Sequence, residues 1–345
     1  MAALSFGLDT FGDVTTGEGD EGPLSHAQVI RNVIAEAVLA DQVGVDFFGV
    51  GEHHRADFAV SSPEIVLAAI AGQTQRIRLG TAVTVLSSDD PVRLFQRFAT
   101  LDAASSGRAE VILGRGSFTE SFPLFGYELA DYEDLFEEKL DLFTTLMREA
   151  EVSWEGRTRA RLVRQRVYPQ VEGRTLSAWI GVGGSPDSVV RAARHRLPLM
   201  LAIIGGDPLR FAPYVDLSQR AHAQFGTQML PIGVHSPGYV AETDDQAREE
   251  MYPSYKQMRD RIGRERGWPA MQRGEFDREV ERGSLYVGSP ETVARKIAAT
   301  MRGLGLSRFQ LKYSAGPLSH ARMLRCIALY GTRVIPLVRE LLAAG

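Results

Sequence analysis

The chain has 345 residues and a mass of 37.9 kDa, which is enough for one large α/β domain or two smaller ones. Its net charge of −4 and pI near 6.0 argue against nucleic acid or an anionic membrane as the main partner. The single cysteine, Cys326, excludes an internal disulfide and a cysteine-based metal cluster. The first residues do not read as a signal peptide, and the longest apolar run, Leu197 to Ile204, is too short to span a bilayer. We therefore expect a cytoplasmic protein.

Short apolar runs of strand type alternate with longer helical patterns along the chain. The expected helices cover Leu24 to Val43, Pro63 to Thr74, Pro91 to Ala104, Tyr132 to Met147 and Ala321 to Leu342. The expected strands are Leu4 to Leu8, Val45 to Val50, Ile77 to Leu86, Ala109 to Gly114, the run at Trp179, Leu199 to Ile203, Leu230 to His235 and Arg308 to Tyr313. Eight apolar strands, each followed by helix, favour a single (β/α)8 TIM-type barrel over residues 1–345. An open doubly wound sheet is the alternative, and eight units in one run make it less favourable.

Two segments interrupt this alternation and are expected to be insertions. Residues 151–170 are rich in arginine and contain short strand-like pieces, so we expect an excursion before the fifth strand. Residues 243–283 are highly charged, and Asp244 to Arg266 reads as a solvated helix. Gly267 to Gly283 contains Gly and Pro without a clear period, and a mobile lid is a candidate there.

The run WIGVGGSPDSVVRAAR, from Trp179 to Arg194, combines a strand end, a glycine turn and a helix start. Gly183 and Gly184 permit a sharp turn and a close approach of the backbone to a ligand. Ser185 suits the N-cap, and the free N–H groups of the first helical turn favour an anion. A phosphate bound by these amides and by the hydroxyls of Ser185 and Ser188 is one interpretation, and an ordinary capped helix is the other. The run lacks the features of a dinucleotide-binding turn.

The second expected strand is followed by Glu52, His53 and His54, which a barrel places on its catalytic face. Adjacent side chains of an extended chain point to opposite sides, so we expect at most one histidine to face the site. A general acid or base is the functional interpretation, in which the carboxylate of Glu52 would orient the ring of His53 and raise its pKa. A hydrogen-bonded structural histidine is the alternative. Zinc is disfavoured because no third ligand motif accompanies the pair.

The strands that follow add two further features. Ile77 to Leu86 is apolar and rich in small residues, as a wall beside a flat aromatic ligand would be, although a long core strand reads the same way. Arg115 lies between two glycines after the fourth strand, where a guanidinium can bind a phosphate bidentately or simply belong to a loop.

Taken together, FFGVGEHHRADF, IRLGTAVTVLSSDDPVRL, ILGRGSF and the GGSPDS turn resemble the bacterial luciferase-like flavin monooxygenases in order and spacing. The resemblance implies a non-proline cis peptide between Ala82 and Val83, beside the flavin ring. It also implies phosphate contacts from Arg115, Ser185 and Ser188, and a catalytic role for His53 with Glu52 before it. Gly114 stands where the family has a reactive cysteine, and Glu133 falls near the position of a second phosphate-binding arginine, so light emission is not implied.

The resemblance implies an enzyme that uses reduced FMN as co-substrate, with molecular oxygen, to oxidise a small organic substrate. A separate flavin reductase is the implied partner, and no metal is expected. A deazaflavin-dependent hydride-transfer enzyme of the same fold and a flavin-binding protein without turnover are the alternatives. A metal-dependent hydrolase is disfavoured by the missing ligand set. A homodimer is implied by the family and suggested by the apolar content of Pro63 to Thr74 (Ile65, Val66, Leu67, Ile70).

Overall fold

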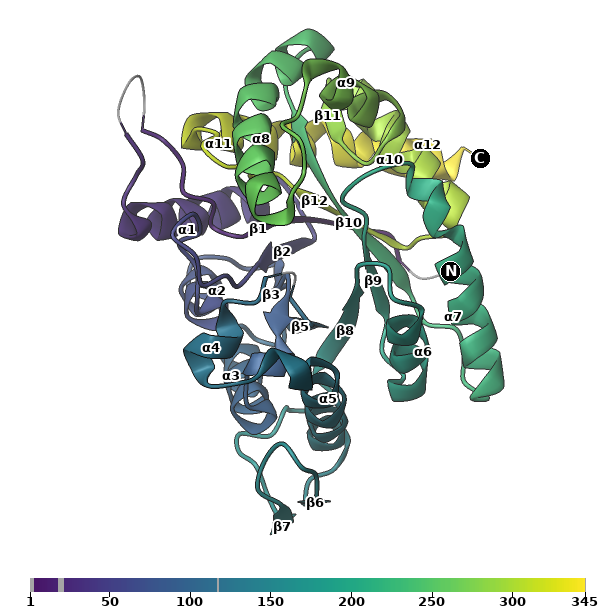
Figure 1. The fold of residues 1–345 in the computed structure, drawn as a ribbon. Helices are drawn as coiled ribbons and strands as arrows, with labels where there is room; N and C mark the ends of the chain where they lie inside the picture. Colours follow the sequence, from purple (N-terminus) through teal and green to yellow (C-terminus); the bar gives the residue numbers. More distant parts are fainter. Residues whose placement is uncertain (1–2, 18–21, 117, 345) are drawn as a thin grey trace.

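In the computed structural model, which describes residues 3–17, 22–116 and 118–344, eight parallel strand positions close into a barrel (Figure 1). Around the ring the order is β1, β2, β3 with β4, β5, β8, β9, β10 and β12, and β12 pairs again with β1. The barrel strands are β1 (Ser5–Thr10), β2 (Phe47–Val50), β3 (Arg78–Thr81), β4 (Thr84–Val85), β5 (Ala109–Gly114), β8 (Ser177–Val182), β9 (Leu199–Ala202), β10 (Ile232–Val240) and β12 (Arg308–Lys312). The expected (β/α)8 barrel is therefore confirmed, and the open sheet is wrong.

Helices surround the ring, and most begin where the sequence supplies a proline in the first turn or a hydroxyl or carboxylate cap. Proline is tolerated there because its missing N–H has no helical partner at that position. Ser25 caps α1 by accepting from the Gln28 amide, and Asp90 caps α3 by accepting from the amides of Val92 and Arg93. The α-helices are α1 (His26–Gln42), α2 (Pro63–Ala71), α3 (Pro91–Ala104), α4 (Ser121–Phe125), α5 (Tyr132–Arg148), α6 (Pro186–His195), α7 (Ala212–Gln224), α8 (Asp244–Arg266), α9 (Arg273–Arg282), α10 (Pro290–Leu304), α11 (His320–Leu329) and α12 (Ile335–Ala343).

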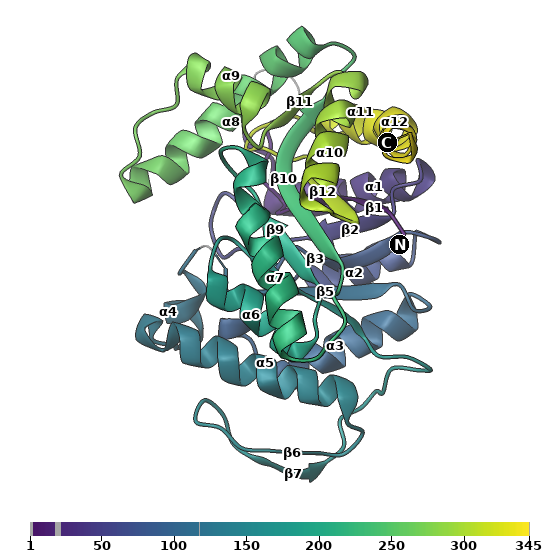
Figure 2. The same cartoon turned by 90° about the vertical axis from the view of Figure 1, so that its right-hand side faces the viewer.

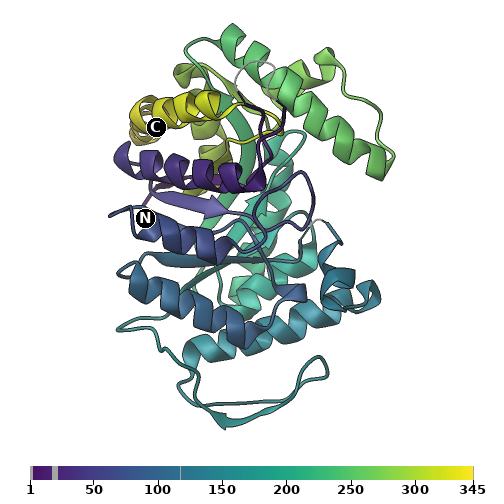
Figure 3. The same cartoon turned by 90° about the vertical axis from the view of Figure 1, so that its left-hand side faces the viewer.

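The two expected insertions lie at opposite ends of the molecule (Figures 2 and 3). The excursion at 151–170 contains an antiparallel hairpin of β6 (Val152–Trp154) and β7 (Leu162–Gln165). The charged segment forms α8 and α9, and a short strand, β11 (Tyr286–Gly288), then extends the sheet beside the end of β10. Gly267 to Gly283 contains a helix that the sequence reading missed. The reason is that α9 buries only Phe276 and Val280, one turn apart, among charged residues.

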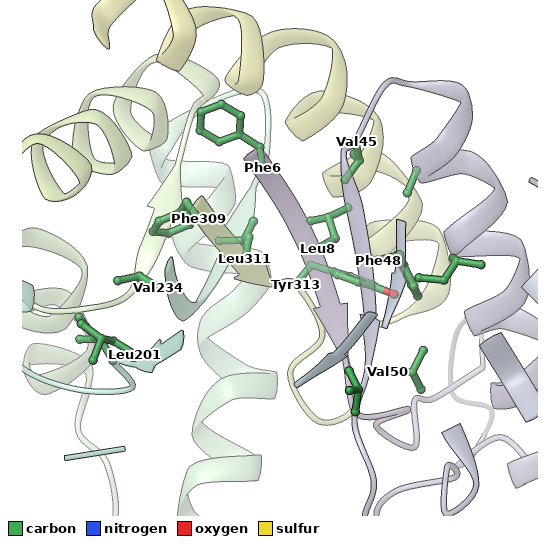
Figure 4. Packing of buried hydrophobic residues seen from close by; sticks show 14 of the residues in the cluster. Phe6, Leu8, Val45, Phe48, Val50, Leu201, Val234, Phe309, Leu311 and Tyr313 are labelled. Carbon is green, nitrogen blue, oxygen red and sulfur yellow. The ribbon is translucent and has the colours of Figure 1, made fainter. Parts of the chain in front are cut away.

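The side chains that face outward from the strands form the core between the barrel and its helices (Figure 4). Phe6 and Leu8 of β1 lie there with Phe309 and Leu311 of β12, all fully buried. Inward-facing residues alternate with them, and a second cluster of Phe47, Ile112, Trp179 and Met200 fills the barrel interior.

A buried ion pair closes the amino-terminal end of the barrel. Arg308 Nη1 lies 2.5 Å from Glu110 Oε1, and the side chains are 4% and 3% exposed. The guanidinium of Arg308 also lies over the rings of Phe47 and Trp179, at 4.0 and 4.8 Å. This end is therefore filled with side chains, which leaves the carboxyl-terminal end of the strands for chemistry.

The residues used to suggest a dimer contact do not form one face. Val66, Leu67 and Ile70 are buried against the barrel, so only Ile65, at 71% exposure, is available to a partner. Val66, Leu67 and Ile70 of α2 pack on their own chain, so the expectation that they form a dimer contact is wrong.

Candidate functional site

The third barrel strand is broken into β3 and β4 by a cis peptide bond between Ala82 and Val83. The expected cis bond is thus confirmed. A Cβ on Gly114 would lie 2.5 Å from Cγ2 of Val83, and one on Gly181 would lie 3.1 Å from Cγ1. The Val83 side chain therefore rests against two neighbouring strands that carry only hydrogen at these positions. This contact gives a physical reason for a glycine, and no larger residue, at position 114.

Glu52 binds His54, which corrects the expectation that it would orient His53. His54 Nε2 lies 2.9 Å from Glu52 Oε1, and the amide of Val85 donates to Glu52 Oε2 at 3.3 Å. The His54 ring meets the edge of Phe125 at 5.1 Å. The two histidines do face different sides, as expected, but the carboxylate lies with His54.

His53 lies in a cage of aromatic rings. The centroids of Phe11, Phe58 and Phe118 lie 4.8, 4.5 and 5.0 Å from that of its imidazole. The Nε2 atom is enclosed and has no hydrogen-bond partner among the described residues. Burial lowers the pKa of His53 from 6.5 to about 3, against the opposing field of Asp13. The expectation that a neighbouring carboxylate raises this pKa is therefore wrong, and His53 is neutral near pH 7.

Arg55 joins the loop after β2 to two other elements. Its guanidinium donates to Glu120 beside α4 and to both carboxylate oxygens of Glu265 on α8. Arg261 of α8 reaches Asp57 of the same loop at 3.5 Å. The part of the charged insertion that contacts the catalytic face is thus the end of α8, next to the segment in which a lid is a candidate.

The residues expected to bind a phosphate lie beside a carboxylate of the protein, that of Glu133. Glu133, in the first turn of α5, pairs through Oε1 with Nη1 of Arg115 and through Oε2 with Nη2 of Arg191, the latter at 3.4 Å. Arg191 Nη1 also donates to Ser188 Oγ at 3.3 Å. Arg115 and Ser188 are therefore linked through Glu133 and Arg191. The sequence reading missed Arg191, because nothing local distinguishes it from a helix-surface arginine.

The glycine turn leads into α6 as expected. Ser185 is the N-cap, but its side chain makes no capping hydrogen bond among the described residues. Gly183 and Gly184 are exposed, and the carbonyl of Gly184 accepts from the Tyr214 hydroxyl at 2.8 Å. The turn therefore presents backbone and hydroxyl groups to solvent at a helix N-terminus.

Two polar groups inside the barrel mouth were absent from the sequence reading. Asp13 and Lys312 pair at 3.1 Å, and Ser314 donates to the same carboxylate at 2.6 Å. Burial alone raises the pKa of Asp13, but Lys312 and the hydrogen bonds from Ser314 and Gly316 outweigh it and leave the pKa below its usual value. Asp9 Oδ2 lies 2.8 Å from His235 Nδ1. The only local signal for the Asp13–Lys312 pair or for the Asp9–His235 pair was a charged or polar residue at the end of an otherwise apolar run.

The sequence profile of the family described as Luciferase-like monooxygenase matches residues 10–308. The chain belongs to this family. Among the curated relatives of the chain, the alkanal monooxygenase alpha chain of the Kryptophanaron alfredi symbiont is 26% identical. That match covers 64% of this chain and 61% of the relative.

Solved structures place the luciferase-like fold on most of the chain. Monooxygenase RslO1 from Streptomyces bottropensis has a TM-score of 0.83 and 25% identity, covering 96% of this chain and 99% of its own. The oxygenating constituent of 3,6-diketocamphane monooxygenase from Pseudomonas putida, in complex with FMN, has a TM-score of 0.77 and 20% identity over 97% and 99%. A coenzyme F420-dependent tetrahydromethanopterin reductase from Methanopyrus kandleri has a TM-score of 0.71 and 18% identity over 97% and 99%.

Within the described ranges, no group of three or more His, Cys, Asp or Glu side chains is arranged to hold a metal ion. The same residues contain no helix with the length and apolar character that a membrane crossing requires.

Proposed function

We propose that this luciferase-like monooxygenase uses reduced FMN and molecular oxygen to oxidise a small organic substrate. The observation that carries the proposal is the pair of arginines that share one carboxylate beside a helix N-terminus. A carboxylate between two guanidinium groups stands where a phosphate has suitable donors. The family and the FMN-bound neighbour support the same cofactor.

The residues present fit a phosphate. Arg115 and Arg191 would hold it, with Ser188, Ser185 and the amides at Gly183 and Gly184, once Glu133 moves aside. Glu133 is 60% exposed on its side chain, so it can turn into solvent without breaking the core. Arg191 thereby takes the place of the arginine that Glu133 replaces in the resemblance.

The remaining residues have roles in positioning and in excluding water. Ala82 and Val83 would lie against the flavin ring, and the phenylalanines around His53 would keep water from that side. His53 would act as a neutral ring, while Glu52 fixes His54 and the backbone of Val85. Reduced FMN supplies the electrons that activate oxygen for transfer of one oxygen atom to the substrate.

A separate flavin reductase, a homodimer and a cytoplasmic location complete the proposal. An exposed groove of about 360 Å³ between α2 and α3, lined by Ile65 and Tyr168 among others, supports an association surface on this side. The F420-dependent neighbour keeps deazaflavin hydride transfer as the alternative, although its 18% identity supports only the fold. Transfer of an oxygen atom from molecular oxygen to the substrate separates the alternatives, since hydride transfer adds none and free reduced FMN consumes oxygen by itself.

The phosphate assignment is tested by comparing FMN with riboflavin, which lacks the phosphate. Arg115→Gln and Arg191→Gln should each weaken FMN at least about tenfold, because a charge-assisted hydrogen bond contributes about 1.5 to 3 kcal/mol. Glu133→Gln should strengthen FMN binding by removing the carboxylate that competes for Arg115 and for Nη2 of Arg191, while Glu137 stays paired with Nε of Arg191. Riboflavin affinity should stay unchanged in all three variants.

The matched control is Asp134→Asn, which removes the same charge from the same turn of α5. Asp134 pairs with Arg157 and not with the two arginines of the site. Equal weakening of riboflavin and FMN by the arginine variants would reject the phosphate site, and so would an FMN affinity that Glu133→Gln leaves unchanged.

A further inference from the structure

The strongest unassigned feature is the contact between Asp9 and His235 inside the barrel. Asp9 is on β1 and His235 on β10, and β12 lies between these two strands in the sheet. Side chains that meet across an intervening strand of a closed barrel do so on its inner side. Asp9 is next to the last residue of β1 and His235 is the fourth residue of β10, and Phe11 links His235 to the aromatic cage of His53.

Asp9 differs from the other buried carboxylates of the barrel because it has so few partners. Asp13 binds Lys312, Ser314 and the amide of Gly316, and Glu110 binds Arg308 and Ser177. Asp9 is fully buried, its Oδ2 has only His235, and its Oδ1 has no partner within the described residues. A buried carboxylate this poorly satisfied is costly for the fold, which favours a role beyond stability.

The contact fixes what the other ring nitrogen of His235 can do. A carboxylate only accepts hydrogen bonds, so Nδ1 of the neutral imidazole carries the proton and Nε2 has its lone pair free. No hydrogen bond of Nε2 is formed within the part of the chain that the structure describes, and the side chain keeps 11% exposure. His235 is therefore oriented as a base, with Asp9 placed to stabilise the imidazolium that forms.

The surroundings of His235 suit a flat, acidic ligand. The ring of Phe11 stacks on the imidazole at 6.1 Å with an angle of 16° between the planes. Lys312 Nζ lies 4.7 Å from the centroid of the same Phe11 ring, paired with Asp13. The ring of Phe11 also contacts His53, which is uncharged near pH 7. Because Asp13 neutralises Lys312, the charge that favours an aromatic anion over its neutral form is that of a protonated His235 beside the Phe11 ring.

We infer that the substrate carries a phenolic hydroxyl and that His235, positioned by Asp9, removes its proton. The O–H bond of the phenol breaks as the Nε2–H bond of His235 forms, giving a phenolate beside an imidazolium that Asp9 stabilises. A phenolate is a more electron-rich ring for oxygen transfer, so the step fits the proposed function, on which this inference rests.

The test uses 4-nitrophenol, whose phenolate is coloured and whose neutral form is not, with the protein free of flavin. The probe is titrated with protein at a pH about one unit below the solution pKa of 4-nitrophenol. At that pH the free probe contains about ten neutral molecules for each phenolate. The wild type should bind the coloured phenolate and shift that ratio by at least tenfold. Asp9→Asn and His235→Gln should each remove the shift.

The control is His222→Gln on α7, a buried histidine whose Nδ1 contacts the hydroxyl of Thr227 at 2.8 Å. It should behave as the wild type, and near-ultraviolet circular dichroism checks that each variant is folded. The measurement on the wild type is enough to overturn the inference, if 4-nitrophenol stays unbound or binds in the neutral form. The FMN and riboflavin comparison uses no phenol, so an intact phosphate preference together with a neutral or unbound phenol rejects only this inference.

Discussion

The aromatic cage of His53 makes the stability of the protein depend on pH in a defined direction. The folded protein holds the pKa of His53 at about 3, whereas the unfolded chain has the ordinary value of 6.5. As the pH falls below 6.5, His53 binds a proton in the unfolded state but stays neutral in the folded state. Stability contributed by the neutral imidazole is therefore full above pH 6.5 and is lost progressively toward pH 3.

The magnitude follows from the difference between the two values. A pH of 5 lies 1.5 units below the pKa of His53 in the unfolded chain. At about 1.4 kcal/mol per unit, the free energy of unfolding should therefore be about 2 kcal/mol lower at pH 5 than at pH 7. His53→Phe keeps a ring among Phe11, Phe58 and Phe118 but cannot be protonated. The variant should therefore lose about 2 kcal/mol less than the wild type between these pH values.

Urea denaturation at pH 7 and pH 5 measures both losses. Other buried histidines with lowered pKa values, His195 and His222, are present in both proteins and cancel in the difference. His26→Gln, at an exposed position, serves as the control and should follow the wild type. An equal acid loss in the wild type and in His53→Phe would refute the assignment of a neutral His53 with an enclosed Nε2.

Two further predictions concern the wall at Val83 and the oligomeric state. Gly114→Ala should cost about 1 to 3 kcal/mol of stability, because its Cβ meets a branched side chain at 2.5 Å, as overpacked cores do. Gly183→Ala, with no atom within 4 Å of the added Cβ, should be tolerated; equal thermal midpoints for the two variants would show that Val83 yields freely. Light scattering at micromolar concentration should give twice the chain mass of 37.9 kDa, and Ile65→Glu should reduce it toward one chain. A wild-type mass of a single chain would reject the dimer.

The sequence by itself determined the barrel and the places where its elements begin. Apolar runs, first-turn prolines and caps such as Ser25 and Asp90 are local signals, so α3 and β5 have the predicted bounds. The family motifs also located the cis bond at Ala82 and the face that carries His53. Helix α9 escaped because a short, charged helix with two buried residues has almost no period to detect.

Only the tertiary structure decided which side chains meet. Glu52 lies next to His53 in sequence but binds His54, because alternate residues of an extended chain share a side. Asp9 and His235 are 226 residues apart, and the order and register of β1, β12 and β10 bring them together. The meeting of Arg115, Glu133 and Arg191 depends on the packing of α5 against α6 at the end of β5. Local sequence encodes the conformation of each segment, whereas charge pairing inside the barrel is a property of the closed ring of strands.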